Sequence, residues 1–288
     1  MRDWEKRDAD IREALEDAAG FLEGDKGYEV VSVNLYGSQN YDCDTPASDY
    51  DFKAIIIPTL NDIILNRKPV SHVIDFGDRG GQIDIKDIRL MFDCYKKQNV
   101  NFIETMFTRW YWVNPTYVQE WEAVREMANC IAFADPAKAL NCMIGMAKEK
   151  QHALCHEYKS KKEILAKYGF DPKQLMHIIR LHALMKDYIE ELTTKVSPKY
   201  GWILIPDENT IDYLMMIKTM SMPVPMDVGA AKAIAAHHID EMAKLIDKFK
   251  EEYDELYSVI NVGAYEKLDG IRARILRKSF KRELLKEI

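Results

Sequence analysis

The stretch LYGSQNYDCDTPASDYDFKAIII, residues 35–57, contains the pattern from which the expected fold follows. Residues 28–35 alternate between apolar and polar side chains, which predicts a strand. That strand ends at the tight turn Gly37-Ser38, and a polar loop follows. The apolar run Asp51–Ile57 then predicts a second strand. Two strands joined by this loop form the expected centre of a sheet.

Two aspartates, Asp49 and Asp51, stand two positions apart where the second strand begins. Alternate residues of a strand point to the same face, so we expect the two carboxylates to project together. Neighbouring carboxylates repel each other unless a cation lies between them, which favours Mg²⁺ or Mn²⁺. Gly37 and Ser38 are expected to bring backbone N–H groups and a hydroxyl near the phosphates of a ligand, because glycine lacks the Cβ that blocks close approach.

A third carboxylate is expected from a neighbouring strand. Residues 71–76 and 81–85 predict two more strands, and the glycine-rich residues 77–81 favour a hairpin turn between them. Asp84 alternates with two isoleucines and is therefore expected on the polar face of its strand. There it would orient or deprotonate an acceptor hydroxyl whose pKa a metal ion lowers. Other nearby acids stay open as alternatives, namely Asp75, Asp78 and Asp87.

After Lys86 the pattern becomes helical almost to the end of the chain. The longest predicted helices cover residues 137–168, 172–192, 228–257 and 264–285. The composition changes near residue 130 from mixed to helical. We therefore predict an α+β fold, with a small mixed β-sheet in a first domain of residues 1–130 and an all-helical second domain of residues 131–288.

Composition and charge restrict the class of protein. The 288 residues are 47% hydrophobic and 30% charged, as in an ordinary globular protein. No apolar run is long enough to cross a bilayer, and the charged start of the chain lacks the apolar region of a secretory signal. Five cysteines without a CxxC pair are typical of reduced thiols, so we expect a cytoplasmic protein with no membrane partner.

The net charge of −7 argues against extensive non-specific binding to nucleic acids, because phosphate neutralisation dominates such binding. A local basic groove is still compatible with this acidity, since a cleft focuses its own field. The oligomeric state is left open.

The motif residues resemble the polymerase-β-type nucleotidyltransferase superfamily, whose pattern is a hydrophobic-Gly-Ser turn, a spacer and Asp-x-Asp. Within it, the chain is most similar to predicted nucleotidyltransferases of bacteria and phages that are associated with RNA repair. Those proteins carry a tyrosine after the Gly-Ser, here Tyr41, and an Asp-Thr-Pro-x-Ser-Asp-x-Asp segment, here residues 44–51. Residues 101–107 and 171–181 resemble two further motifs of that group. The resemblance covers about residues 28–185.

This resemblance implies an enzyme that transfers a nucleoside monophosphate from an NTP such as ATP to an acceptor, with Mg²⁺ or Mn²⁺ as cofactor. It places the catalytic core in residues 1–130 and substrate or nucleotide binding in residues 131–288. By position, the metal-binding and catalytic residues are Asp49, Asp51 and Asp84, and the nucleotide-binding residues are Gly37, Ser38, His177 and Arg180. The alternative for His177 and Arg180 is a buried histidine beside an arginine that pairs with a neighbouring acid.

The acceptor is left open by the resemblance. The first hypothesis is a nucleic-acid end, such as a tRNA or another RNA, because basic residues gather near the C-terminus. These residues are Arg272, Arg274, Arg277, Lys278, Lys281, Arg282 and Lys286, and a solvated structural helix is the alternative reading of them. The second hypothesis is nucleotidylation of a protein or a small molecule, which the acidic net charge favours. A third is a non-catalytic, nucleotide-binding regulatory module.

Overall fold

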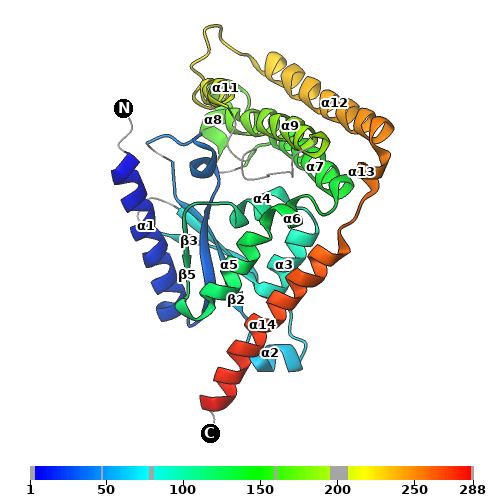
Figure 1. Cartoon of the computed structure of the whole chain (residues 1–288). Coiled ribbons are helices and arrows are strands. Elements are labelled where there is room, and N and C mark those ends of the chain that lie inside the picture. The colour runs from blue at the N-terminus through cyan, green and yellow to red at the C-terminus, as the bar shows by residue number, and fades with distance from the viewer. Residues whose placement is uncertain (1–3, 47, 78–80, 159–160, 195–206, 287–288) are drawn as a thin grey trace. The chain divides into compact units, whose positions relative to one another are not determined.

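The structure is a computed structural model that describes residues 4–46, 48–77, 81–158, 161–194 and 207–286. The chain forms two compact units, and neither is a single stretch of sequence (Figure 1). Unit 1 comprises Met1–Asn40, Asp44–Ala134 and Asn261–Ile288, and unit 2 comprises Tyr41–Cys43 and Asp135–Ile260.

Unit 1 is built on a five-stranded sheet with the strand order β3-β4-β2-β1-β5. The strands are β1 (Glu29–Tyr36), β2 (Asp51–Ile57), β3 (Ser71–Phe76), β4 (Gly81–Asp87) and β5 (Tyr111–Val113). β2 and β4 pair in parallel, whereas all other neighbours pair in an antiparallel manner. The sheet is therefore mixed and the fold is α+β, as the sequence predicts.

Helical segments connect and cover these strands. They are α1 (Trp4–Gly20), the π-helical turn η1 (Phe21–Asp25), the 3-10 turn η2 (Ser38–Tyr41), α2 (Leu60–Ile64), α3 (Ile88–Lys96), α4 (Val100–Ile103), η3 (Glu104–Met106), η4 (Pro115–Tyr117), α5 (Val118–Glu126), α6 (Ala128–Ala132) and α14 (Val262–Lys286). Asp87 caps α3 as predicted, since its side chain accepts a hydrogen bond from the backbone N–H of Arg89.

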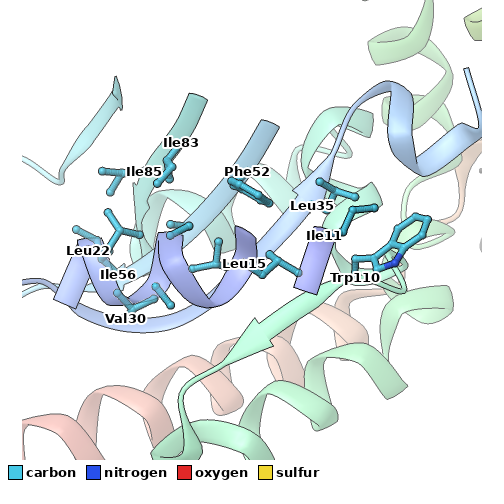
Figure 2. Packing of buried hydrophobic residues seen from close by; sticks show 14 residues of the cluster. Ile11, Leu15, Leu22, Val30, Leu35, Phe52, Ile56, Ile83, Ile85 and Trp110 are labelled. Atoms are coloured by element: carbon cyan, nitrogen blue, oxygen red, sulfur yellow. The ribbon is translucent and has the colours of Figure 1, made fainter. Parts of the chain in front are cut away.

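One face of the sheet is apolar and packs against α1 (Figure 2). The buried residues of α1 recur at helical spacing, so they form one stripe along the helix. Figure 2 shows Ile11, Leu15 and Leu22 of this stripe beside strand residues such as Phe52 and Ile83. Each large aliphatic side chain that is removed from water here contributes about 1.5–3 kcal/mol to folding.

The opposite face of the sheet carries polar and charged side chains. Successive strand residues alternate between faces, so the residues of β1, β2 and β4 that do not belong to the core against α1 lie on this side, together with the buried Ile55 and Ile57 of β2. Ser32 and Asn34 of β1 are both buried there, and the Asn34 amide donates to the Ser32 hydroxyl over 2.9 Å. α3 contacts β2 and β4, and η3 contacts β1. This covered polar face carries the residues of the candidate site.

The last helix, α14, belongs to unit 1, although the sequence analysis assigned everything after residue 130 to a second domain. It lies beside α3 and α5 (Figure 1). Ile271 and Ile275 are buried, and the Lys278 ammonium lies 3.1 Å from the Glu120 carboxylate of α5. The predicted boundary is corrected for a physical reason: an amphipathic helix packs where a complementary surface exists, whatever its position in the sequence.

Unit 2 consists of helices: α7 (Pro136–Ala153), α8 (Lys162–Tyr168), α9 (Pro172–Thr193), α11 (Glu208–Thr219), α12 (Val228–Glu252) and α13 (Asp254–Ser258). α9 contacts α7, α11 and α12 and is the centre of the unit. Each of α7, α9, α11 and α12 begins at an aspartate whose side chain accepts from a backbone N–H of the first turn; these caps are Asp135, Asp171, Asp207 and Asp227. Among the described residues, no helix is both long and apolar enough to cross a membrane.

Two predicted helices are interrupted in the structure, and one strand was not predicted. Residues 137–168 form α7 and α8 instead of one helix, and residues 228–257 divide into α12 and α13 at Tyr253. Helical periodicity continues across both breaks, so the local pattern did not reveal them. β5 was not predicted, because three residues are too few to establish an alternation. β3 and β4 pair as the predicted hairpin, but residues 78–80 of its turn lie outside the described residues.

We predict that Leu15→Ala lowers the free energy of unfolding by about 2–5 kcal/mol, because it removes a side chain that is 2% exposed in the core between α1 and the sheet. Urea denaturation followed by circular dichroism measures this change. Glu16→Ala, on the exposed side of the same helix, is the matched control and is expected to change stability by less than about 0.5 kcal/mol. Equal stability of the two variants would contradict the packing of α1.

Candidate active site

The Gly-Ser turn after β1 is held by one asparagine. Gly37 has a φ of +83°, a backbone conformation that glycine adopts without strain. The Asn40 backbone N–H donates to the Gly37 carbonyl over 2.9 Å, and its side-chain amide donates to the Leu35 carbonyl over 2.9 Å. The Thr108 hydroxyl donates to the Asn40 side-chain oxygen over 2.7 Å. Because both parts of the Asn40 side chain are engaged, the turn has a defined geometry.

The carboxylate of Asp51 lies beside this turn. Asp51 is the first residue of β2 and pairs with Tyr36, the last residue of β1. A Cβ added to Gly37 would stand 3.8 Å from the Asp51 Oδ2 atom, so the glycine leaves space next to the carboxylate. Asp49 lies two residues before the strand and is exposed, whereas Asp51 is partly buried. The structure thus brings Gly37 and Asp51 together, with Asp49 close along the chain.

The loop between the turn and these acids is anchored to α1. The Arg7 guanidinium donates to the Asp44 carboxylate over 3.2 Å and to the Gln39 backbone carbonyl over 2.8 Å. The Arg7 and Asp44 side chains are each 11% exposed. Further along, the Thr45 backbone N–H donates to the Ser48 hydroxyl over 2.8 Å. Asp44 and Ser48 of the motif therefore shape the loop that leads to Asp49.

A row of charges of alternating sign follows Asp51 on the polar face of the sheet. Lys53 is two residues after Asp51 in β2, and the parallel register pairs Lys53 with Asp84 of β4. Lys86 is two residues after Asp84. Because residues two apart share a face and paired residues lie side by side, the four charged side chains belong to one surface.

The distances in this row are short. Asp84 accepts from the Lys53 ammonium over 3.2 Å at one oxygen and from the Lys86 ammonium over 2.6 Å at the other. The Lys53 and Asp84 side chains are 5% and 11% exposed. The Lys53 ammonium also lies 3.7 Å from the centre of the Tyr36 ring and 4.7 Å from that of Phe102. Both rings attract a cation through their faces, so Lys53 is held on several sides.

The other acids that the sequence left open have different surroundings. Asp87 is fully buried and is paired with Arg89 over 2.5 Å, besides capping α3. This hydrogen bond raises the pKa of the Arg89 guanidinium. Asp75 of β3 accepts from the Gln82 amide over 3.1 Å. Asp78 lies outside the described residues.

The carboxylates of the site can be compared with the ligands that a divalent cation requires. Mg²⁺ is commonly held by one or two carboxylates together with substrate phosphates and water, and the pair Asp49 and Asp51 fits that pattern. Asp84 differs, because lysine ammonium groups occupy both of its oxygens. Within the described ranges of the chain, no three Asp, Glu, His or Cys side chains gather into a metal-binding cluster. Asp84 as a third ligand beside Asp49 and Asp51 therefore stays a prediction.

His177 and Arg180 both lie on α9 in unit 2. Arg180 is 4% exposed, and its guanidinium carbon lies 4.0 Å from the centre of the ring of Tyr41, the motif tyrosine, which also belongs to unit 2. Burial lowers the pKa of His177 well below its usual value, and the positive charge of Arg180 lowers it further. The imidazole is therefore neutral near pH 7.

Lys53 and Lys86 were missed by the sequence analysis. A sequence pattern for them was present, because Asp-x-Lys occurs in both strands, as Asp51-Phe52-Lys53 and as Asp84-Ile85-Lys86. Only the register between β2 and β4 shows that the two copies lie side by side. A single sequence does not contain that register.

Comparisons with known proteins add little to this geometry. No family model and no curated protein matches the chain. Among solved structures, a nucleotidyltransferase-like protein from Exiguobacterium sibiricum 255-15 aligns with 84% of this chain and 91% of that chain, at 8% sequence identity and a TM-score of 0.30. A TM-score this low carries no argument about fold or function. The functional assignment therefore rests on the residues themselves.

We predict that Gly81→Ala disturbs the candidate site through the backbone. A Cβ at Gly81 would stand 2.2 Å from the carbonyl oxygen of Tyr50, the residue between the two acids, so the Tyr50 backbone must move. We expect a loss of about 1–3 kcal/mol in urea denaturation, the usual cost of overpacking, together with weaker Mn²⁺ binding. Gly20→Ala, where nothing lies within 4 Å, is the control and should lose neither. Unchanged stability and metal binding in Gly81→Ala would contradict this contact.

Proposed function

We propose that this protein is a metal-dependent nucleotidyltransferase that moves a nucleoside monophosphate from an NTP to an acceptor hydroxyl. The acceptor oxygen attacks the α-phosphorus, the bond from that phosphorus to the bridging oxygen breaks, and pyrophosphate leaves while the hydroxyl releases its proton to water. One observation supports this proposal above the others. The Asp51 carboxylate lies beside Gly37 in the turn after β1, and Asp49 is two residues away.

Each part of this arrangement has a task in the proposed reaction. Asp49 and Asp51 would hold Mg²⁺ or Mn²⁺, which when bound would offset phosphate charge and stabilise the leaving pyrophosphate. The missing Cβ at Gly37 leaves room for phosphate next to the Asp51 carboxylate, and the Ser38 hydroxyl and backbone N–H groups can donate to phosphate oxygens. Asp84 shares the sheet face and is proposed to act on the side of the acceptor hydroxyl. By motif resemblance, His177 and Arg180 of unit 2 are proposed nucleotide-binding residues.

We predict that Asp49→Asn and Asp51→Asn each lower transfer of labelled NMP by at least about 100-fold, since the amide keeps the shape and deletes the ligand charge. The melting temperature without ligand should stay close to that of the wild type. Mg²⁺ plus NTP should raise the melting temperature of the wild type and raise it less in either variant, because a ligand that binds the folded state stabilises it by mass action.

Asp17→Asn, an exposed aspartate of α1, is the matched control and should behave as the wild type. Normal transfer in either site variant would rule out the proposed metal site. A wild type that binds Mg²⁺ and NTP but transfers to no RNA, protein or metabolite would favour the non-catalytic regulatory module instead.

For the acceptor we propose an RNA end, on the basis of α14. Several of its basic residues pair with acids of unit 1, such as Arg282 with Glu29 over 3.2 Å, and so have structural roles. Three others, Arg274, Arg277 and Lys281, are exposed and lie at i, i+3 and i+7, on one face of the helix. A stripe of exposed cations is a surface that binds the phosphate backbone of a nucleic acid.

We predict that replacing all three exposed residues with glutamine weakens RNA binding and flattens its salt dependence. For single-stranded RNA the log–log slope changes by about 0.7 per phosphate contact, so the loss of three contacts should reduce it by about 2. NTP binding should be unchanged. Filter binding at several salt concentrations measures the slope.

The matched control replaces three exposed lysines of α12 with glutamine, namely Lys232, Lys248 and Lys250, and thus makes the same change in net charge. If the α14 and α12 variants bind RNA equally well, the α14 stripe is a solvated structural face. A protein or small-molecule acceptor would then become the first hypothesis.

A further inference from the structure

The pairing of Asp84 disfavours an ordinary role as a metal ligand. Both of its oxygens accept from ammonium groups, at 3.2 Å from Lys53 and 2.6 Å from Lys86. Asp84 is 8% exposed and Lys53 is 4% exposed, so water cannot easily replace this pair. A metal ion that took Asp84 as a ligand would have to share its oxygens with the two ammonium groups or displace one of them, and like charges repel in a mostly buried site.

Lys53 is held where it stands by the fold. The backbone pairs Lys53 with Asp84 across the β2–β4 ladder, so the two side chains share a face at adjacent positions. Its ammonium group also lies over the rings of Tyr36 and Phe102, at 3.7 Å and 4.7 Å from their centres. Tyr36 of β1 precedes the Gly-Ser turn, and Phe102 lies on α4, so side chains from two further elements contact the cation.

The charges of the site also disfavour a second divalent ion. The carboxylates of Asp49, Asp51 and Asp84 and the ammonium groups of Lys53 and Lys86 leave one net negative charge among five side chains. With one divalent cation bound, these five side chains and the ion together carry one net positive charge. A second divalent ion at Asp84 would lie beside two fixed ammonium groups, where like charges repel.

We propose that Lys53 takes the place of a second metal ion in this site, so that the protein binds its nucleotide with one divalent cation, held at Asp49 and Asp51. This inference rests on the proposed nucleotidyl transfer. Lys53 supplies fixed positive charge on the acceptor side, where it stabilises negative charge that develops on the attacking oxygen. Asp84 is then a positioning residue that acts through Lys53 and binds no metal.

The test counts metal ions and does not depend on turnover. Wild-type protein is dialysed against Mn²⁺ with the α,β-methylene analogue of each of the four NTPs in turn, and bound Mn²⁺ and bound analogue are both measured. We expect one Mn²⁺ per bound analogue and an electron paramagnetic resonance spectrum without coupling between manganese ions. Two Mn²⁺ per analogue with a coupled spectrum would overturn the inference, since paired metals in such sites lie about 3.5–4 Å apart. If neither Mn²⁺ nor any analogue binds, the proposed function itself fails.

Variants of Lys53 then test whether this residue determines the number of Mn²⁺ ions bound per analogue. Lys53→Met removes the cation and is expected to raise the ratio to two Mn²⁺ per analogue, whereas Lys53→Arg keeps the charge and the ratio of one. Lys97→Met, an exposed lysine that follows α3, is the matched control and should also keep a ratio of one. A ratio of one in folded Lys53→Met would overturn the assignment to this residue.

If Lys53→Met does not fold, Asp84→Asn decides the question. The inference expects folded Asp84→Asn to bind Mn²⁺ with the analogue, weakened by no more than the roughly 10–100-fold that the loss of an outer-shell partner produces, because Asp84 is no ligand. Complete loss of Mn²⁺ binding in folded Asp84→Asn would show that Asp84 ligates the metal and would overturn the inference.

Discussion

The parallel register between β2 and β4 is the constraint on which the rest of unit 1 depends. A strand has a period of two, so one register decides at once which residues meet on both faces of the sheet. With Lys53 opposite Asp84, Phe52, Ala54 and Ile56 of β2 and Ile83 and Ile85 of β4 belong to the core against α1, and the charged residues meet one another on the other face. A shift that turned β2 over would place Lys53 in the apolar core and Phe52 on the charged face. The hydrophobic contacts of α1 therefore also determine the geometry of the candidate site.

Buried charges are costly to desolvate, and this sheet contains several of them within two adjacent strands. The cost is offset because the charges alternate in sign along the face and because aromatic rings surround Lys53. The arrangement is rigid, since each partner is fixed by a strand. Such rigidity is what a site for phosphate chemistry requires, because fixed charges need no reorganisation during the reaction.

Much of this organisation was predictable from the sequence, and the exceptions share one cause. The bounds of β2 and β3 and the cap at Asp87 follow from alternation and capping, which are local properties. The role of Lys53, the return of α14 to unit 1 and the strand β5 depend on contacts between residues far apart in the sequence. Aspartates at the start of a strand indicate a site from their spacing alone, whereas the Asp-x-Lys pattern of β2 and β4 indicates one only when the register that places its two copies side by side is known.

The return of α14 to unit 1 affects the order in which the chain can fold during synthesis. The sheet and α3 leave the ribosome before unit 2, but α14, which packs beside α3 and α5, is made after unit 2. The apolar surface that receives Ile271 and Ile275 thus stays uncovered while unit 2 is being made. The two ends of the inserted residues 135–260 meet where the Asn261 N–H donates to the Ala134 carbonyl over 2.7 Å. When unit 2 folds before α14 is made, the effective loop between Ala134 and Asn261 becomes shorter. The entropy cost of closing that loop falls as a result.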